Sequence, residues 1–149
     1  MHNRYEYLKL GYNYRMTDIA GAIGLEQLKK LDTWTQKRVK NAKLLNDLLS
    51  GVPWLELPEV IDGHVFHQYT IKVLNGKRDA LKVHLETNEI GCAIYYPKPL
   101  HTFDLFAKEV HDACGNTEAL CKQVISLPVN PLVTENDLQK IAETIKLLK

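Results

Sequence analysis

The segment TDIAGAIGLEQLKKLDTWTQKRVKNAKLLNDLLSG, residues 17–51, decides the architecture of this 149-residue chain. Its apolar positions recur at steps of mostly three to five residues, the spacing of one face of an α-helix. Thr17 can cap the start of this helix, and Asp18 adds an acidic group to the first turn. Gly51 and Pro53 end the pattern. The stripe consists of Ile19, Ile23, Leu28, Leu31, Trp34, Arg38, Ala42, Leu45 and Leu49.

A helix of about nine turns is longer than most helices in globular proteins. We therefore expect it to span two bodies instead of packing along one. The chain then divides into a loop at 1–16, a long interdomain helix at 17–51 and a small C-terminal domain at 52–149.

The remainder of the chain alternates short strand patterns with helix patterns. Strands are expected at 64–73 (HVFHQYTIKV), 92–97 (CAIYYP) and 124–129 (VISLPV), with a turn at Asn75-Gly76 after the first. One helix is expected to be capped by Asp79 and to run to about Glu89, with Gly91 just past its end. Two short helices are expected at 102–112 and 117–124, and Thr134 with Asp137 should open a last one. This order predicts an α+β fold, in which a small, mostly antiparallel sheet carries helices on one face.

The composition is that of a soluble globular domain, with 45% hydrophobic and 25% charged residues. A formal net charge of +1 argues against nucleic acid or a membrane surface as a partner. The opening residues MHNRYEYLKL lack the apolar core of a signal peptide, so a cytoplasmic location is expected.

Three cysteines, Cys92, Cys114 and Cys121, form no CxxC pair, which favours idle thiols over a disulfide framework. His111, Cys114 and Cys121 could be metal ligands on adjacent turns. A structural zinc site normally needs four ligands, so we expect no metal here.

Among the histidines, His64 and His67 lie three residues apart on an expected strand and should point to opposite faces. We expect both to be partly buried and hydrogen-bonded. His101 follows the rigid YYPKPL turn and could lie either in a cleft or on the surface.

The residues before the long helix form a candidate anion site. Arg15 offers a planar, permanently charged fork, and Asn13 offers a neutral donor. Both precede the positive end of a helix. A solvated loop in which Arg15 pairs with a surface acid is the alternative, and the residues alone leave both open.

Several of these segments resemble those of a known protein family. GYNYRMTDIAGAIGLEQLKKLD resembles the GYNxRM(T/S)xxxAAxGxxQLxxLD segment of the DegT/DnrJ/EryC1/StrS family. Members are pyridoxal-phosphate-dependent aminotransferases, most of which act on nucleotide-linked keto sugars. The similarity continues through HQYTIKV, RDALKVHLETNEIG, YYPKPLH and ISLPVNPLVTENDLQKI.

The resemblance covers only the C-terminal part of such an enzyme, the small domain of a fold-type I aminotransferase. It implies a missing N-terminal large domain, which carries the Schiff-base lysine, and a homodimer partner. No catalytic residue is therefore expected in this chain, which should be inactive alone. A stand-alone, non-catalytic binding or dimerisation module of the same fold is the alternative.

For the site, the resemblance implies that the loop at 11–16 reaches across a dimer into the neighbouring active site. Asn13 would bind the phosphate of pyridoxal 5'-phosphate there. Arg15 would hold the anionic part of a nucleotide-sugar substrate, with Tyr12 and Tyr14 shaping the wall.

The resemblance also implies a substrate-side role for the YYPKPLH turn. Tyr95 stands where the family often has His, whereas Tyr96 and His101 match the family pattern. The amino donor would usually be glutamate. Gly21 and Gly24 would allow another backbone to pack closely against the long helix.

Overall fold

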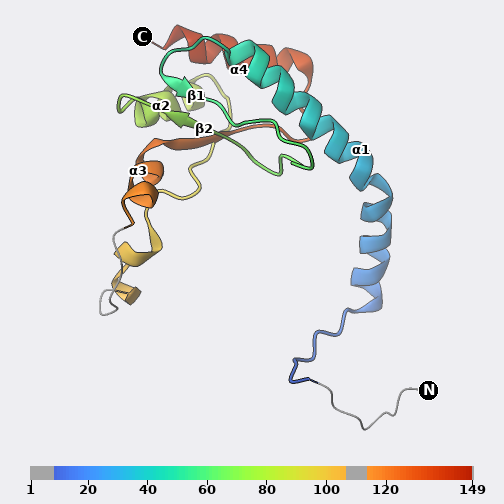
Figure 1. The fold of residues 1–149 in the computed structure, drawn as a ribbon. Helices are drawn as coiled ribbons and strands as arrows, with labels where there is room; N and C mark the ends of the chain where they lie inside the picture. Colours follow the sequence, from blue (N-terminus) through green and yellow to red (C-terminus); the bar gives the residue numbers. More distant parts are fainter. Residues whose placement is uncertain (1–8, 107–113, 149) are drawn as a thin grey trace, which may run out of the picture. The chain divides into compact units, whose positions relative to one another are not determined.

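The computed structural model describes residues 9–106 and 114–148 (Figure 1). The chain forms two compact units, Met1–Asp32 and Thr33–Lys149, here called the first and second unit. One helix, α1 (Asp18–Leu49), begins in the first unit and ends in the second. Within the described residues, no helix combines the length and the apolar character that a membrane crossing requires.

The ends of α1 follow the signals that predict them. Thr17 caps the helix, since its Oγ1 accepts a hydrogen bond from the Ala20 N–H at 3.3 Å. After Leu49 the backbone turns through Gly51, whose φ of +82° favours glycine. The predicted long helix is confirmed to within two residues at each end.

The second unit contains a three-stranded antiparallel sheet of order β1-β2-β3. Its strands are β1 (Leu55–Glu56), β2 (Tyr69–Val73) and β3 (Val124–Leu127). In the central pair, Ile71 lies opposite Ile125. The α+β prediction with an antiparallel sheet is therefore confirmed.

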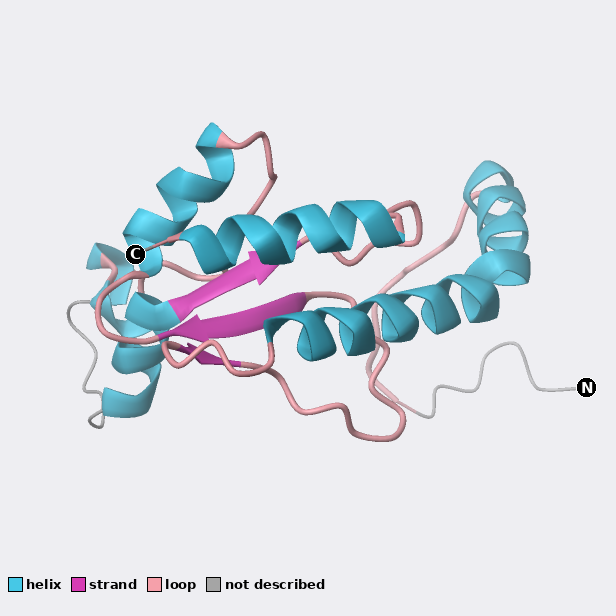
Figure 2. Ribbon diagram, turned by 90° about the horizontal axis from the view of Figure 1, so that it is seen from above, coloured by secondary structure: helices cyan, strands magenta, loops and turns pink. Residues whose placement is uncertain are grey.

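Alternation along β2 separates the two faces of this sheet. Tyr69, Ile71 and Val73 are buried, whereas Thr70 and Lys72 between them are half-buried. The buried face shares one core with apolar side chains of the second half of α1, of α2 (Arg78–Thr87) and of α4 (Glu135–Leu147). Figures 1 and 2 show α4 and this half of α1 on the same side of the strands. These helices bury the apolar face of β2.

Two of the predicted strands are wrong in their extent. Only 69–73 of the segment 64–73 is strand, because Phe66 adopts a positive φ of 46° just before it. The predicted strand at 92–97 is reduced to a single bridge between Ala93 and Ser126. Two prolines follow that bridge, and proline cannot donate to a ladder.

The helix boundaries also need correction. Asp79 lies in the first turn of α2 and does not cap it, because the N-cap position is Lys77. The helix ends at Thr87, before the predicted Glu89, which itself takes a left-handed φ of 60°. Gly91 is therefore not the residue that ends this helix.

The last third of the chain follows the prediction more closely. The described part of the predicted helix at 102–112 forms 3₁₀ turns and no α-helix: η1 (Leu100–Thr102) overlaps it at one residue, and η2 (Asp104–Phe106) lies within it. Residues 107–113 lie outside the described part. The next helix, α3 (Gly115–Gln123), starts two residues before the predicted one. The capping box at the start of α4 is confirmed, since the Thr134 side chain and Asp137 bond each other's backbone N–H.

Candidate functional site

The first group of predicted site residues lies in the loop before α1. Tyr12 and Tyr14 are exposed, with ring centroids 5.9 Å apart. Asn13 and Arg15 are exposed as well. Within the described residues, neither side chain makes a hydrogen bond or an ion pair. In the described part of the chain, Arg15 therefore has no acidic partner, which does not support the alternative of a pair with a surface acid.

The donors of this loop suit an anion. Asn13 offers an amide N–H₂ and Arg15 a fork of N–H groups, and both precede the N-terminus of α1. Carboxylate and phosphate oxygens are the acceptors that such a fork binds in pairs. The donor set therefore fits a phosphate group, such as that of pyridoxal phosphate or of a nucleotide.

The second group of predicted site residues lies in the second unit, at the turn that follows Ala93. Tyr95 and Tyr96 line a cavity of about 650 Å³ together with Leu100 and Phe103. The two tyrosine rings meet edge to face at 5.9 Å, and Lys98 Nζ lies 4.8 Å from the Phe103 ring centre. This mixture of aromatic walls and one cation is typical of a ligand cavity.

His101 is placed beside this cavity and not among the residues that line it. Its side chain is 20% exposed, and Nε2 lies 3.2 Å from Oε1 of Glu118. The contact joins η1 to α3, which carries Thr117 and Leu120 of the cavity wall. His101 is therefore positioned to hold the turn at 95–101 against α3.

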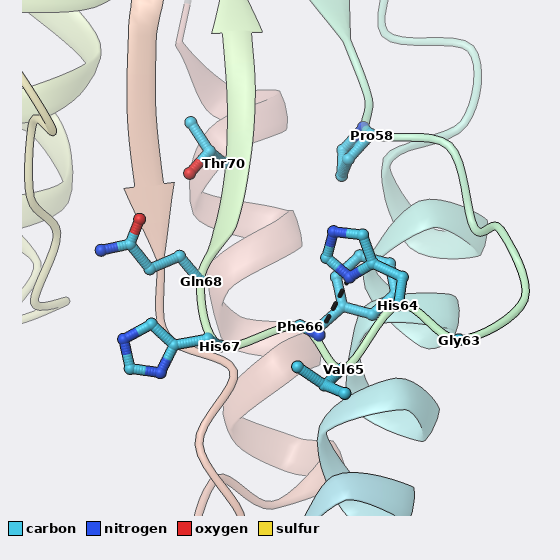
Figure 3. A pocket seen from close by; sticks show the side chains of 8 residues that line it. All are labelled: Pro58, Gly63, His64, Val65, Phe66, His67, Gln68 and Thr70. Atoms are coloured by element: carbon cyan, nitrogen blue, oxygen red, sulfur yellow. Dashed lines mark hydrogen bonds between the residues drawn. The ribbon is translucent and has the colours of Figure 1, made fainter. Parts of the chain in front are cut away.

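The predictions for His64 and His67 are wrong in their placement. Both precede β2 and are exposed, so they share no strand. His64 Nδ1 accepts a hydrogen bond from the Phe66 N–H at 2.9 Å, and its ring lies 4.0 Å from the Phe66 ring (Figure 3). Both histidines border a cavity of about 540 Å³. The alternation of apolar and polar residues in this segment predicts a continuous strand and gives no sign of the turn at Phe66, whose φ is positive.

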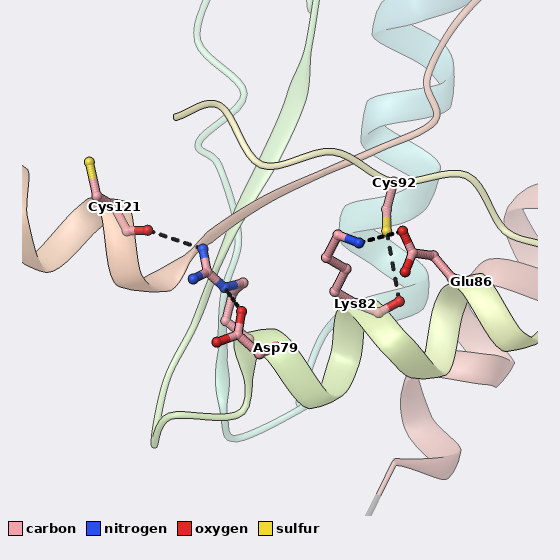
Figure 4. A network of polar contacts seen from close by, with 6 residues as sticks. Asp79, Lys82, Glu86, Cys92 and Cys121 are labelled. Atoms are coloured by element: carbon pink, nitrogen blue, oxygen red, sulfur yellow. Dashed lines mark hydrogen bonds and ion pairs between the residues drawn. The ribbon is translucent and has the colours of Figure 1, made fainter. Parts of the chain in front are cut away.

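The proposed cysteine and histidine ligands do not form a metal centre in the described residues. His111 lies outside them, and Cys121 is buried. Among the described residues, no group of three His, Cys, Asp or Glu side chains is arranged to hold a metal. Burial raises the pKa of the Cys92 thiol, which lies beside the Lys82–Glu86 ion pair of α2 (Figure 4). A raised pKa keeps this thiol protonated and poorly reactive.

Comparison with known proteins assigns the chain to a class. Residues 1–146 match the DegT/DnrJ/EryC1/StrS aminotransferase family, which is dependent on pyridoxal phosphate. Because this match covers nearly the whole chain, the chain belongs to that family.

Individual relatives support the same assignment. The chain is 35% identical to a "Pleiotropic regulatory protein" of Geobacillus stearothermophilus, covering 95% of this chain and 39% of the relative. It is also 35% identical to a UDP-N-acetyl-3-dehydro-alpha-D-glucosamine 3-aminotransferase of Acidithiobacillus ferrooxidans, a match that covers 95% of this chain and 38% of that enzyme. The structure of S. venezuelae DesV in complex with a ketimine intermediate superposes with a TM-score of 0.85 at 25% identity, covering 98% of this chain and 40% of DesV.

The chain thus spans about 39% of the length of the first relative it matches. The similarity in fold shows that the chain corresponds to part of a larger aminotransferase.

Proposed function

We propose that this chain is the C-terminal portion of an aminotransferase that uses pyridoxal 5'-phosphate. The enzyme would transfer an amino group from glutamate to a nucleotide-linked keto sugar. The observation that supports this proposal most is the family match over residues 1–146. It includes Asn13 and Arg15, two donors whose side chains have no hydrogen-bond partner among the described residues. The printed activity of the Acidithiobacillus relative, an aminotransferase of a UDP-linked sugar, favours the sugar substrate.

The loop residues would bind the anionic groups. Pyridoxal phosphate, when bound, supplies the electron sink that lets an amino group move between carbon atoms. The Asn13 amide would donate a hydrogen bond to its phosphate in the partner subunit. Arg15 would hold the phosphates of the nucleotide sugar, with Tyr12 and Tyr14 beside them. The N-terminus of α1 favours negative charge at this place.

The aromatic cavity in the second unit would serve the substrate. Tyr95 and Tyr96 present ring faces and hydroxyl groups, which can orient a sugar and exclude water. His101 would act as a positioning residue through its contact with Glu118. These roles are those that the resemblance to the family implies, and the chemistry of the side chains suits them.

The domain organisation is part of the same proposal. Residues 1–16 would form the active-site loop, 17–51 the interdomain helix and 52–149 the small domain. Ile19, Ile23 and Leu28 are exposed. A large domain, present in the longer protein, would cover them and supply the lysine that holds the cofactor.

A first test uses the 149-residue chain itself. Incubation with pyridoxal phosphate, reduction with borohydride and mass spectrometry should show no stoichiometric label on any one lysine. Glutamate-dependent turnover should be absent, because an exposed loop supplies only one wall of the site. A single labelled lysine together with turnover would show that the chain is active alone.

A second test concerns Arg15 in the complete enzyme. Arg15→Ala should slow the half-reaction with the sugar nucleotide roughly tenfold or more, since a lost charged hydrogen bond costs about 1.5–3 kcal/mol. The half-reaction with glutamate should stay within about twofold. Lys37→Ala, which removes an exposed cation of α1, is the matched control. Equal loss in both half-reactions would contradict the assignment.

The cross-subunit arrangement has its own test. One variant of the complete enzyme lacks the cofactor lysine, and another carries Asn13→Ala with Arg15→Ala. Each homodimer should be nearly inactive, whereas mixed dimers should regain activity at one site. If subunits exchange and activity does not return, the loop serves its own subunit.

The relative described as a pleiotropic regulatory protein favours a second candidate. In that case the chain would be a non-catalytic binding or dimerisation module of the same fold. A complete protein that folds and dimerises but performs neither half-reaction would support this candidate.

A further inference from the structure

A smaller cavity of the second unit has a chemistry that the proposed function does not use. It encloses about 370 Å³ and lies where four segments meet. Arg38 comes from α1, His67 and Gln68 precede β2, Tyr95 follows the Ala93 bridge, and Asn130 follows β3. Among the described residues that line this cavity there is no aspartate or glutamate.

Arg38 is the charged group of this cavity. It occupies a position of the apolar stripe of α1 and is half-buried. Its Nη1 donates to the His67 carbonyl oxygen at 3.4 Å, which is a long hydrogen bond. Within the described part of the chain, Arg38 forms no ion pair. Most of its five N–H donors therefore have no protein acceptor among the described residues.

Arg78 shows what a structural arginine looks like in the same unit. Its Nε donates to Asp79 Oδ1 at 2.6 Å, and its Nη1 donates to the Cys121 carbonyl oxygen at 3.0 Å. A carboxylate and a helix-end carbonyl thus use both sides of that guanidinium. Among the described residues, Arg38 has no carboxylate of this kind, which leaves its fork available to a ligand.

The neighbouring side chains add donors without negative charge. His67 and Gln68 point to the same side, away from His64 (Figure 3). The Gln68 amide and the Tyr95 hydroxyl can each donate to an oxygen of a ligand. The cavity therefore combines one permanent cation with neutral donors, and this set selects an anion.

We propose that this cavity binds the carboxylate of the amino donor, with Arg38 as the specificity residue. The identification as amino donor rests on the proposed function. A planar guanidinium matches a carboxylate in a two-point contact. The volume lies near the lower end of the about 300–1,000 Å³ of ligand pockets, which suits a small dicarboxylate better than a nucleotide sugar. Tyr95 borders both this cavity and the aromatic cavity, so the two ligands would bind at neighbouring places, one in each half-reaction.

The test is a titration of the 149-residue chain with glutarate, followed by ¹⁵N NMR. Saturable shifts are expected at the amides of 67–68 and 93–95 and at the Arg38 side-chain N–H. Arg38→Gln should weaken binding at least tenfold, whereas Lys37→Gln, which removes a neighbouring exposed cation, should change it less than twofold. Absence of saturable shifts, or equal binding by Arg38→Gln, would overturn the proposal.

Two further binding measurements test the type of anion and the two-point contact. Inorganic phosphate should bind more weakly than glutarate, and tighter binding of phosphate would overturn the assignment to a carboxylate. If Arg38→Gln does not fold, Arg38→Lys keeps the charge but loses the fork and should still bind at least threefold more weakly. Retention of full affinity by the lysine variant would overturn the two-point contact. None of these arms needs transamination, so they can fail or succeed independently of the proposed function.

In the complete enzyme, the same substitution separates the two half-reactions. Arg38→Gln should raise the KM for glutamate at least tenfold and leave the sugar-nucleotide half-reaction within twofold. An equal effect on both half-reactions would overturn the role of Arg38 in binding the donor.

Discussion

The two halves of α1 continue the same apolar stripe into opposite environments. In the first half, Ile23 and Leu28 are 59% and 64% exposed. In the second half, Leu45 and Leu49 are buried in the core of the second unit. A helical period thus specifies the helix in both halves, but it does not say what covers the apolar side.

The sequences of the halves differ in a way that explains this contrast. Residues 19–25, Ile-Ala-Gly-Ala-Ile-Gly-Leu, contain no polar side chain over nearly two turns, so every side of the helix is apolar. A Cβ at Gly24 would meet nothing within 4 Å among the described atoms. In the second half, exposed Lys37, Lys40 and Asp47 form a polar side opposite the core. Residues 19–25 therefore expose apolar surface on several sides, which is consistent with the proposed large domain and partner subunit.

The largest expected effect is the loss of stability caused by a substitution in the buried half of α1. Leu45→Ala should lower the free energy of unfolding by about 2–5 kcal/mol, because it leaves a cavity in a fully buried site. Leu28→Ala, the matched change in the exposed half, should alter it by less than about 0.5 kcal/mol. Urea unfolding of both variants measures the difference. Similar losses would show that Leu28 belongs to the core of the isolated chain.

The second prediction concerns association through the exposed half. The isolated chain should self-associate, because uncovered apolar side chains gain about 25 cal/mol per Å² when buried. Ile23→Lys with Leu28→Lys should weaken this association at least tenfold without lowering stability. Light scattering across a concentration series measures it. Unchanged association would assign the contact to another surface.

A smaller effect separates the caps of the two helices. Thr134→Ala should cost about 1 kcal/mol of global stability, because the capping box begins α4, whose Leu138 and Ile141 are buried. Thr17→Ala removes the cap of the exposed half and should leave the unfolding midpoint unchanged while fraying the first turn. Chemical denaturation and amide exchange of the two variants distinguish these outcomes. An equal shift in midpoint would mean that the first turns of α1 unfold with the core.

The smallest effect is the pH dependence of the contact between α1 and α4. Lys40 pairs with Glu135 at 2.7 Å and lowers the pKa of that carboxyl below its usual value. The pair therefore contributes stability above the unfolded-state pKa of about 4.3 and loses it as the pH falls through the lower folded-state pKa. Both side chains are exposed, so the effect should be small and should decrease with salt. The stability difference between wild type and Lys40→Met should shrink between pH 6 and pH 3; a constant difference would show that it does not come from the pair.

The sequence was sufficient where local signals determine structure. Thr17, Gly51 and the Thr134–Asp137 pair mark helix ends through backbone chemistry that needs no distant partner. Strand β1 was missed because Leu55–Glu56 is too short to show a period. The predicted strand at 92–97 failed because pairing depends on a distant neighbour, and only Ala93 finds one.

The candidate sites also differ in how far they can be predicted from local sequence. The donors of the loop, Asn13 and Arg15, stand close together in the sequence and could be named from it. The cavity around Arg38 is assembled from four distant segments, so no spacing rule reveals it. A basic residue at an apolar stripe position was the single local sign, and only the fold shows that Arg38 has no acidic partner among the described residues.

Hydrogen exchange along α1 shows directly whether the first half of this helix is a surface for another body. In the isolated chain, diluted until it is monomeric, amides of 38–49 should exchange slowly with those of β2. Amides of 18–32 should exchange at least tenfold faster, because no core covers them. In the complete enzyme, 18–32 should become as protected as 38–49. Equal protection of both halves in the monomeric chain, or fast exchange of 18–32 in the complete enzyme, would contradict the account.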